Sequence, residues 1–145
     1  MKTVNRFFEI RELHDLTQND IAKKLNISRQ NYSFWETNTK FIPLLHLNNY
    51  CKIFNLSMDY VFKFSNDKKC KYTSYIINKK TIGNNLKQFR IQHNINQQDL
   101  AKELNTSQST ISAYESGKTL ILTSFAYYIC YKYNVSLGWL CYNTK

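Results

Sequence analysis

The chain has few of the residues from which catalytic and cofactor sites are usually built. It contains three glycines and three histidines, and no phosphate-binding glycine loop, paired-carboxylate motif or nucleophile motif accompanies them. Its four cysteines form no CxxC pair, which argues against a zinc or redox site. We therefore expect no enzyme, no metal ion, no cofactor and no small-molecule ligand.

Long apolar segments are also missing. No apolar run approaches the roughly 18 residues that a membrane-spanning helix needs. The first residues, MKTVNR, lack the apolar core of a secretory signal. We expect a soluble, cytoplasmic protein without membrane contact.

Acidic residues are half as numerous as basic ones. The sequence has 20 Lys and Arg against 10 Asp and Glu, a formal net charge of +10. The most basic stretch is 63–80, with six lysines and one aspartate. Such a balance indicates polyanionic or acidic partners, but charge alone fits ribosomal, membrane-surface and nucleic-acid roles about equally.

An internal repeat organises the chain. Residues 11–62 align without a gap to residues 90–141, at a constant offset of 79. We predict two domains of about sixty residues, near the lower limit of independent folding, with the limits 1–63 and 80–145 and a basic linker at 64–79. Each copy is expected to be all-α, with five short helices at 3–14, 18–25, 29–36, 44–54 and 57–63, and at the same positions 79 residues later.

The second half of the linker is apolar. The aromatic and aliphatic residues there, Tyr72, Tyr75, Ile76 and Ile77, make this half too apolar for a free tether. We therefore expect it to pack on a domain or to lengthen the first helix of copy two.

Cys51 and Cys130 occupy matched positions on apolar helix faces, where we expect small buried hydrophobes.

Capping residues predict where the second helix of each copy begins. Thr17 with Asp20 has the spacing of a capping box, and Asn96 with Asp99 repeats it. In a capping box each side chain accepts a hydrogen bond from the other residue's backbone amide. The beginning of the second helix is therefore well defined in both copies.

A sharp turn should follow the second helix. Asn26 and Asn105 stand where the chain needs a positive φ, which asparagine tolerates better than other residues with a side chain. Ser28 and Ser107 then cap the third helix. The two helices and the turn between them have the pattern of a helix-turn-helix.

Two ion pairs are expected at matched positions. Arg11 and Glu36 correspond to Arg90 and Glu115, and in each copy the arginine precedes the glutamate by 25 residues. A partly buried pair would join the first helix to the end of the third. The alternative is four unrelated surface charges.

The ordered motifs resemble the phage repressor and Cro family of helix-turn-helix domains (xenobiotic-response-element-like transcriptional regulators), and the resemblance covers both copies but not the linker. In copy one it is carried by Arg11, Leu16-Thr17-Gln18, Ile21-Ala22, Ser28, Trp35-Glu36, Pro43 and Leu47. In copy two it is carried by Arg90, Gln97, Leu100-Ala101, Ser107, and Tyr114-Glu115-Ser116-Gly117. Two positions depart from the family pattern, since Asn38 replaces a glycine and Leu122 replaces a proline.

The resemblance implies that the third helix of each copy enters the major groove of double-stranded DNA. The residues expected to contact bases are Arg29, Gln30, Asn31, Ser33 and Phe34 in copy one, and Gln108, Ser109, Thr110, Ser112 and Ala113 in copy two. The residues expected to contact phosphates are Gln18, Lys40, Gln97 and Lys118. Without the resemblance, these polar residues would be read as an ordinary solvated helix face.

These expectations lead to one main function and one alternative. The main function is a sequence-specific transcriptional regulator of bacterial or phage origin, a repressor associated with the nucleoid, whose unlike third helices read two different sequences. The alternative is a protein-binding regulator, such as an antitoxin or antirepressor, because a fold does not determine a function.

The fourth helix of copy two is aromatic on nearly every face. Its aromatic residues are Phe125, Tyr127, Tyr128 and Tyr131, where copy one has His46, Asn48, Asn49 and Lys52. A helix that is apolar all round is usually buried against something. We expect this surface to form a homodimer, or else to contact copy one and the linker.

Overall fold

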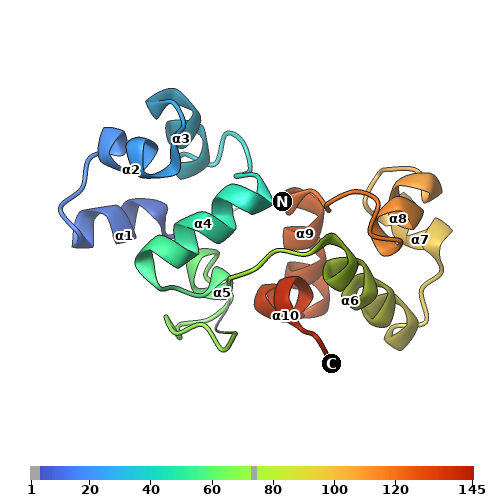
Figure 1. The fold of residues 1–145 in the computed structure, drawn as a ribbon. Coiled ribbons are helices and arrows are strands. Elements are labelled where there is room, and N and C mark those ends of the chain that lie inside the picture. Colours follow the sequence, from blue (N-terminus) through green and yellow to red (C-terminus); the bar gives the residue numbers. More distant parts are fainter. Residues whose placement is uncertain (1–3, 73–74) are drawn as a thin grey trace. The chain divides into compact units, whose positions relative to one another are not determined.

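The computed structural model describes residues 4–72 and 75–145, and within these ranges every regular element is a helix. The chain divides into two compact units, residues 1–73 and 74–145 (Figure 1). The first contains α1 (Phe7–Leu13), α2 (Gln18–Leu25), α3 (Arg29–Glu36), α4 (Leu44–Phe54) and α5 (Met58–Val61). The second contains α6 (Lys79–Gln92), α7 (Gln97–Glu103), α8 (Gln108–Glu115), α9 (Thr123–Tyr133) and α10 (Leu137–Tyr142). The prediction of an all-α fold with five helices in each copy is confirmed.

The predicted capping box is complete in the first unit, and the second unit has the bond to the N-cap side chain. Thr17 Oγ1 accepts a hydrogen bond from the Asp20 amide at 3.1 Å, and Asp20 Oδ2 accepts one from the Thr17 amide at 2.8 Å. In the second unit the Asn96 side chain accepts from the Asp99 amide at 2.8 Å. These bonds satisfy amides that have no partner inside the helix, and so they fix the first residue of α2 and of α7.

Asparagine adopts the left-handed conformation where the chain turns between helices. Asn26 and Asn105 both have a φ of 57°, as predicted for the turn before the third helix. Asn38 has a φ of 63°, and the matched Gly117 has a φ of 78°. The replacement of glycine by asparagine after α3 therefore leaves the backbone conformation unchanged.

Each unit packs its helices around an apolar interior. Ala22 of α2 and Ala101 of α7 are buried, and α2 packs against α3 as α7 packs against α8. A small side chain suits a close approach of helices, because a larger one would have to displace its neighbours. Cys51 and Cys130 are buried, as predicted from their apolar surroundings.

The first helix begins later than predicted. α1 starts at Phe7, residues 4–6 are not helical, and the remainder of the predicted first turn lies outside the described residues. The reason is a tertiary contact, since Arg6 donates its amide to the carbonyl of Val61 at 2.8 Å and its Nε to the carbonyl of Tyr60 at 2.8 Å. These bonds hold the chain against α5 in place of an earlier helical turn. α5 is also shorter than its predicted range of 57–63.

Residues 64–72, which the sequence places in the linker, form hydrogen bonds with the first unit. Ser57 donates its amide to the carbonyl of Lys68 at 2.8 Å and its hydroxyl to the carbonyl of Asp67 at 3.0 Å. Arg6 Nη2 donates to Asn66 Oδ1 at 2.9 Å. This basic stretch is therefore a folded loop beside the beginning of α5.

The first helix of copy two begins three residues earlier than predicted, at Lys79. Asn78 Oδ1 caps it by accepting from the amides of Lys80 and Thr81 at 2.9 and 3.1 Å. Ahead of the cap, the Tyr75 ring packs edge-on against Tyr142, with 6.3 Å between ring centroids. The apolar segment thus packs on the second unit in part, and the helix that follows it is lengthened at its start, which is the other outcome expected of this segment.

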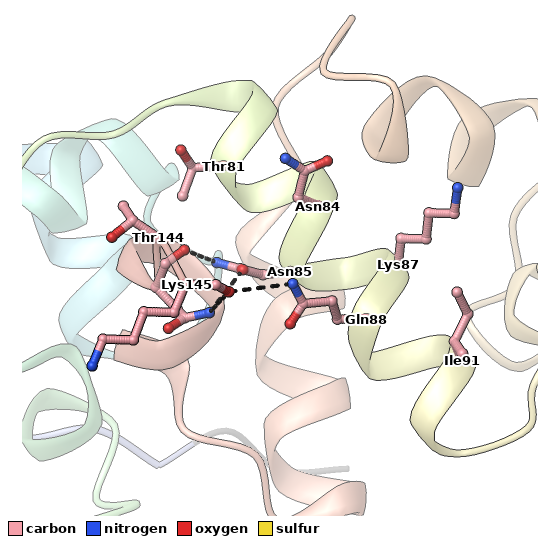
Figure 2. A pocket seen from close by; sticks show the side chains of 9 residues that line it. Thr81, Asn84, Asn85, Lys87, Gln88, Ile91, Thr144 and Lys145 are labelled. Carbon is pink, nitrogen blue, oxygen red and sulfur yellow. Dashed lines mark hydrogen bonds between the residues drawn. The ribbon is translucent and has the colours of Figure 1, made fainter.

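Asn85 ties α6 to the end of α10. Its amide donates to the carbonyls of Trp139, Leu140 and Asn143 at 3.1, 3.0 and 2.9 Å, and Figure 2 shows the side chain directed at the C-terminal residues. The matched residue in copy one is Arg6, which donates to the matched carbonyl of Tyr60. The two copies therefore close the same contact with different side chains.

No helix in the described ranges has both the length and the apolar character required to cross a bilayer.

Candidate nucleic-acid interface

Bidentate ion pairs anchor the ends of α3 and α8. In the first unit Arg11 Nε and Nη2 donate to the two carboxylate oxygens of Glu36 at 3.0 and 2.8 Å. In the second unit Arg90 makes the same two bonds to Glu115 at 2.7 and 2.9 Å. The Arg side chains are 13% and 14% exposed and the Glu side chains 6% and 5%. Each pair joins the first helix of its copy to the end of the third, as the repeat predicts.

Each arginine also holds the loop before the second helix. Arg11 Nη1 donates to the carbonyl of Leu16 at 3.0 Å, and Arg90 Nη1 donates to that of Ile95 at 3.1 Å. Burial raises the pKa of the Glu36 carboxyl, but hydrogen bonds led by that from Arg11 outweigh it and hold this pKa below its ordinary value. The carboxylate is therefore ionised at neutral pH and bound firmly to its partner.

Glutamine connects the second helix to the third in both copies. In the first unit, Arg29 Nη1 donates to Gln18 Oε1 at 2.9 Å. In the second, Gln108 Nε2 is 3.4 Å from Gln97 Oε1, and Gln97 Nε2 donates to Glu115 Oε1 at 3.2 Å. The first residue of α8 is thus linked through Gln97 to the buried ion pair. This hydrogen-bonded chain was not predicted from the sequence.

The outward face of α3 is accessible. Arg29, Gln30 and Asn31 are exposed, and Ser33 and Phe34 are half-buried. The inward face is formed by Tyr32 and Trp35, which are 0% and 6% exposed. All the residues of α3 predicted to contact bases therefore lie on the side of the helix that faces away from the core.

Lys40 extends this face beyond the end of α3. It is exposed, and its Nζ lies 4.6 Å from the centroid of the Phe34 ring, a cation–π contact. The contact brings a positive charge next to an apolar side chain on the same face. The face therefore offers guanidinium, amide, ammonium and apolar groups side by side.

The outward face of α8 is uncharged. Gln108, Ser109 and Ser112 are exposed, whereas Thr110 and Ala113 are half-buried. The hydroxyls of Ser109 and Thr110 both lie 2.9 Å from Ser107 Oγ, the cap of the helix. These two hydroxyls therefore have less capacity left to bind another group. The exposed cation nearest to α8 in sequence is Lys118, which follows the helix.

Asn5 contributes to the end of α3 and was not predicted from the sequence. Its Nδ2 donates to the carbonyl of Trp35 at 3.1 Å and to Asn38 Oδ1 at 2.7 Å. It precedes the region from which the repeat was defined, and the signal that could have marked it is the asparagine at the same position of copy two. The matched residue in copy two, Asn84, is exposed on α6 (Figure 2).

The aromatic residues of α9 are used mostly inside the second unit. Tyr127 is 2% exposed, and Phe125 lies 6.4 Å from Tyr114 between ring centroids. The Tyr128 hydroxyl donates to Glu103 Oε1 at 3.2 Å. Tyr131, at 62% exposed, is the member of the predicted set that remains on the surface. The apolar surface on α9 is therefore smaller than the sequence suggests.

Comparisons with known proteins match both copies. Residues 8–61 match a family described as helix-turn-helix, and residues 83–144 match one described as helix-turn-helix domain. Over 62 residues the chain is 29% identical to the uncharacterized HTH-type transcriptional regulator YobD of Bacillus subtilis (strain 168). That match covers 43% of this chain and 55% of the relative, about half of its length. No solved structure matches the chain.

Proposed function

We propose that this chain, which belongs to the repressor and Cro-like helix-turn-helix family and carries two copies of its domain, is a DNA-binding transcriptional regulator. The observation that carries the proposal is the polar, exposed face of α3, whose opposite side is fixed in the core by Tyr32 and Trp35. A rigid helix with a free face of donors and acceptors suits the major groove, which admits one α-helix and displays the base edges.

In copy one the residue types match known base contacts. The Arg29 guanidinium suits the O6 and N7 acceptors of guanine, and the Gln30 amide suits adenine. Phe34 can meet a thymine methyl group. Because Gln18 accepts a hydrogen bond from Arg29, the guanidinium is already directed before DNA arrives. Asn31 and Ser33 are the other residues of α3 proposed to contact bases.

Phosphate contacts would position both helices on the duplex. Gln18 and Gln97 are the first residues of α2 and α7, where free backbone amides and the positive end of the helix dipole favour an anion. Lys40 and Lys118 follow the third helices and are exposed. Such contacts set the register of a protein on DNA but do not carry sequence information.

The two copies are proposed to read unlike sequences. Arg29 and Gln30 of α3 correspond to Gln108 and Ser109 of α8, so the charged donor of copy one is replaced by a neutral amide. Ser112, Thr110 and Ala113 add small side chains in copy two. A single chain would then prefer a site made of two different halves, and occupation of such a site by the protein would act as repression.

Selection of binding sites from random double-stranded DNA tests this proposal. With the full chain, Arg29→Ala should relax the base preference in one half of the selected site and leave the other half unchanged. Gln108→Ala should do the reverse, so that each variant is the control for the other. If a lone chain selected one palindromic site, this would contradict the proposal that α3 and α8 read different sequences.

A salt titration separates DNA binding from the protein-binding alternative. If several phosphates are contacted, the logarithm of the binding constant falls with the logarithm of salt concentration by about 0.9 per contact. Lys40→Ala should reduce this slope by about one contact. Failure of the full chain to bind any DNA at low salt would favour an antitoxin or antirepressor that holds a protein.

Self-association through α9 remains part of the proposal. Tyr131 is exposed and its ring stacks on that of Tyr127, with 6.3 Å between centroids and 10° between planes. Tyr131→Asn should lower the mass measured by sedimentation if α9 forms a homodimer. A mass equal to that of the unchanged protein would remove this surface from consideration.

A further inference from the structure

The first helix of copy two has an extension that copy one lacks. α6 has 14 residues and α1 has 7, and the repeat aligns α1 with the second half of α6. The additional residues, 79–85, form about two turns of helix. Asn78 caps this extension through two hydrogen bonds to backbone amides.

The extension lies against the C-terminal end of α8, and Figure 1 shows α6 beside α8. A Cβ atom built on Gly83 would be 2.3 Å from the carbonyl oxygen of Tyr114 and 2.7 Å from that of Glu115. A Cβ on Gly117 would be 2.7 Å from Lys80 Cγ and 3.0 Å from Lys80 Cα. Two of the three glycines of the chain therefore stand where this contact is tightest.

Copy one closes the end of α3 in another way. The matched positions hold Val4 and Asn38, and residue 4 is not helical. Here the side chain of Asn5 donates to the carbonyl of Trp35 and to Asn38 Oδ1. Thus the Asn5 side chain contacts the end of α3 in copy one, whereas the helix backbone at Gly83 contacts the end of α8 in copy two.

We propose that residues 79–85 position α8 for its DNA contacts, and that Gly83 is the positioning residue. This inference rests on the proposed function. A side chain at position 83 meets backbone carbonyls, which cannot rotate away, so α6 and the end of α8 must separate. The start of α8 keeps its own supports, because α8 also packs against α7 and Ser107 caps its first turn.

The displacement should therefore be uneven along α8. Ser112, Ala113 and Lys118 lie near the end that moves, whereas Gln108 lies at the end that is held. Base contacts tolerate little misplacement, and the loss of discrimination at one base pair is worth about tenfold in affinity. Gly83 thus affects which bases copy two distinguishes, although it contacts no DNA itself.

The test uses the full chain with Gly83→Ala, and DNA in which one half of the selected site at a time is scrambled. Affinity for the half read by copy two should fall about tenfold. Base preference should be lost at the positions read from Ser112 and Ala113 and kept at the position read from Gln108. The half read by copy one should be bound as before, and Val4→Ala, at the matched position of copy one, should change neither half.

A second variant covers the outcome in which Gly83→Ala fails to fold. Asn78→Ala removes the cap and adds no atoms, so it should fray the extension and leave the core of the second unit intact. We expect a loss of about threefold on the same half of the site, the effect of a helix cap of moderate strength. Amide hydrogen exchange at Ser116 and Gly117 should accelerate in the absence of DNA.

The outcomes distinguish the two levels of inference. An unchanged protein that binds no DNA would refute the proposed function. An unchanged protein that binds DNA, combined with a folded Gly83→Ala variant of equal affinity and equal base preference, would refute the positioning role. If Gly83→Ala does not fold, Asn78→Ala decides, and equal binding with equal exchange would overturn the inference.

Discussion

Tyr50 places a hydroxyl in the core of the first unit where the second unit has Ile129. Both residues are 0% exposed, and the Tyr50 hydroxyl finds no hydrogen-bond acceptor among the residues that the structure describes. Burial raises the pKa of Tyr50, so the phenol stays neutral. A buried polar group without a partner costs free energy, whereas the apolar residue of copy two avoids this cost.

Tyr50→Phe should therefore stabilise the first unit. Removal of the hydroxyl should raise the free energy of unfolding by about 1 kcal/mol, because no hydrogen bond is lost and a desolvation cost disappears. Urea unfolding followed through Trp35 measures the change, with Trp139 replaced by Phe so that one tryptophan reports. Tyr131→Phe removes an exposed hydroxyl and should have little effect. A lower stability of Tyr50→Phe would contradict this account.

Glu36 makes the first unit sensitive to acid. Because the folded pKa of Glu36 is lowered, its stabilisation is fully present above the unfolded pKa of about 4.3 and is lost as pH falls through the folded value. The lowered pKa of Asp20, in the capping box, acts in the same direction. Thermal unfolding of the first unit should thus shift to lower temperature below about pH 4.

Glu36→Gln should remove most of that acid dependence. At neutral pH it should also cost about 3 kcal/mol, since the mostly buried guanidinium of Arg11 loses Glu36 and keeps only the exposed carboxylate of Glu12, at 3.7 Å. Glu9→Gln is a suitable control, because the Glu9 side chain is 50% exposed and pairs with Arg6, not with Arg11. An acid transition that is identical with and without Glu36 would show that other carboxylates govern it.

At the scale of elements, α9 is attached to α7 by a polar cluster that copy one lacks. Glu103 accepts hydrogen bonds from the hydroxyl of Tyr133 at 2.8 and 2.7 Å, from the hydroxyl of Tyr128 and from Lys132. The matched position to Glu103 in copy one is Lys24. Burial raises the pKa of Glu103, but the hydrogen bond from Lys132 and those from the tyrosines outweigh it and lower that pKa overall.

Glu103→Gln should loosen this attachment. Loss of the charge-assisted bonds should lower the free energy of unfolding of the second unit by about 1 kcal/mol. Fluorescence of Trp139 in a Trp35→Phe background reports the second unit separately. Lys24→Gln, the matched change in copy one, should leave the first unit unaffected. An unchanged second unit would mean that the cluster is solvated in solution.

Helix limits could be predicted where the signal is local. Thr17 and Ser28 cap helices through bonds to residues three positions on, so spacing alone reveals them. The start of α1 could not be predicted, because it depends on a distant partner, the Val61 carbonyl that accepts a hydrogen bond from the Arg6 amide. By contrast, the lengthening of the first helix of copy two was one of the expected outcomes, and Asn78 caps that helix through residues two and three positions on.

In the candidate site, too, local features could be predicted and contacts between distant segments could not. The periodic burial of α3 places Arg29 and its neighbours outside correctly, since Tyr32 and Trp35 had to face inward. The hydrogen bond from Arg29 to Gln18 and the contact of Asn5 with Trp35 join segments that no spacing rule relates. Burial of Tyr127 could not be anticipated from composition, because a helix with aromatic residues on several faces does not reveal which face its neighbours cover.

At the scale of the whole molecule, the two copies should act as separate readers on one chain. Replacement of Gln108, Ser109, Thr110 and Ala113 by Arg, Gln, Asn and Phe, with the buried Ile111 kept, would give both third helices the same outward face. The full chain should then select DNA that contains the first half-site twice, whereas the unchanged chain should select two different halves. Sequencing of selected random DNA measures this. Selection of the original site by the altered chain would exclude α8 as a reader.

Positive φ at asparagine also affects the denatured ensemble. The tight turns at Asn26, Asn55, Asn105 and Asn134 are made without glycine. Asparagine samples fewer backbone conformations than glycine when the chain is disordered, so each turn loses less entropy on folding. In exchange it bears a small left-handed strain in the native state. Domains this small have few apolar contacts to spare, and a restricted denatured chain contributes to their stability without any added native contact.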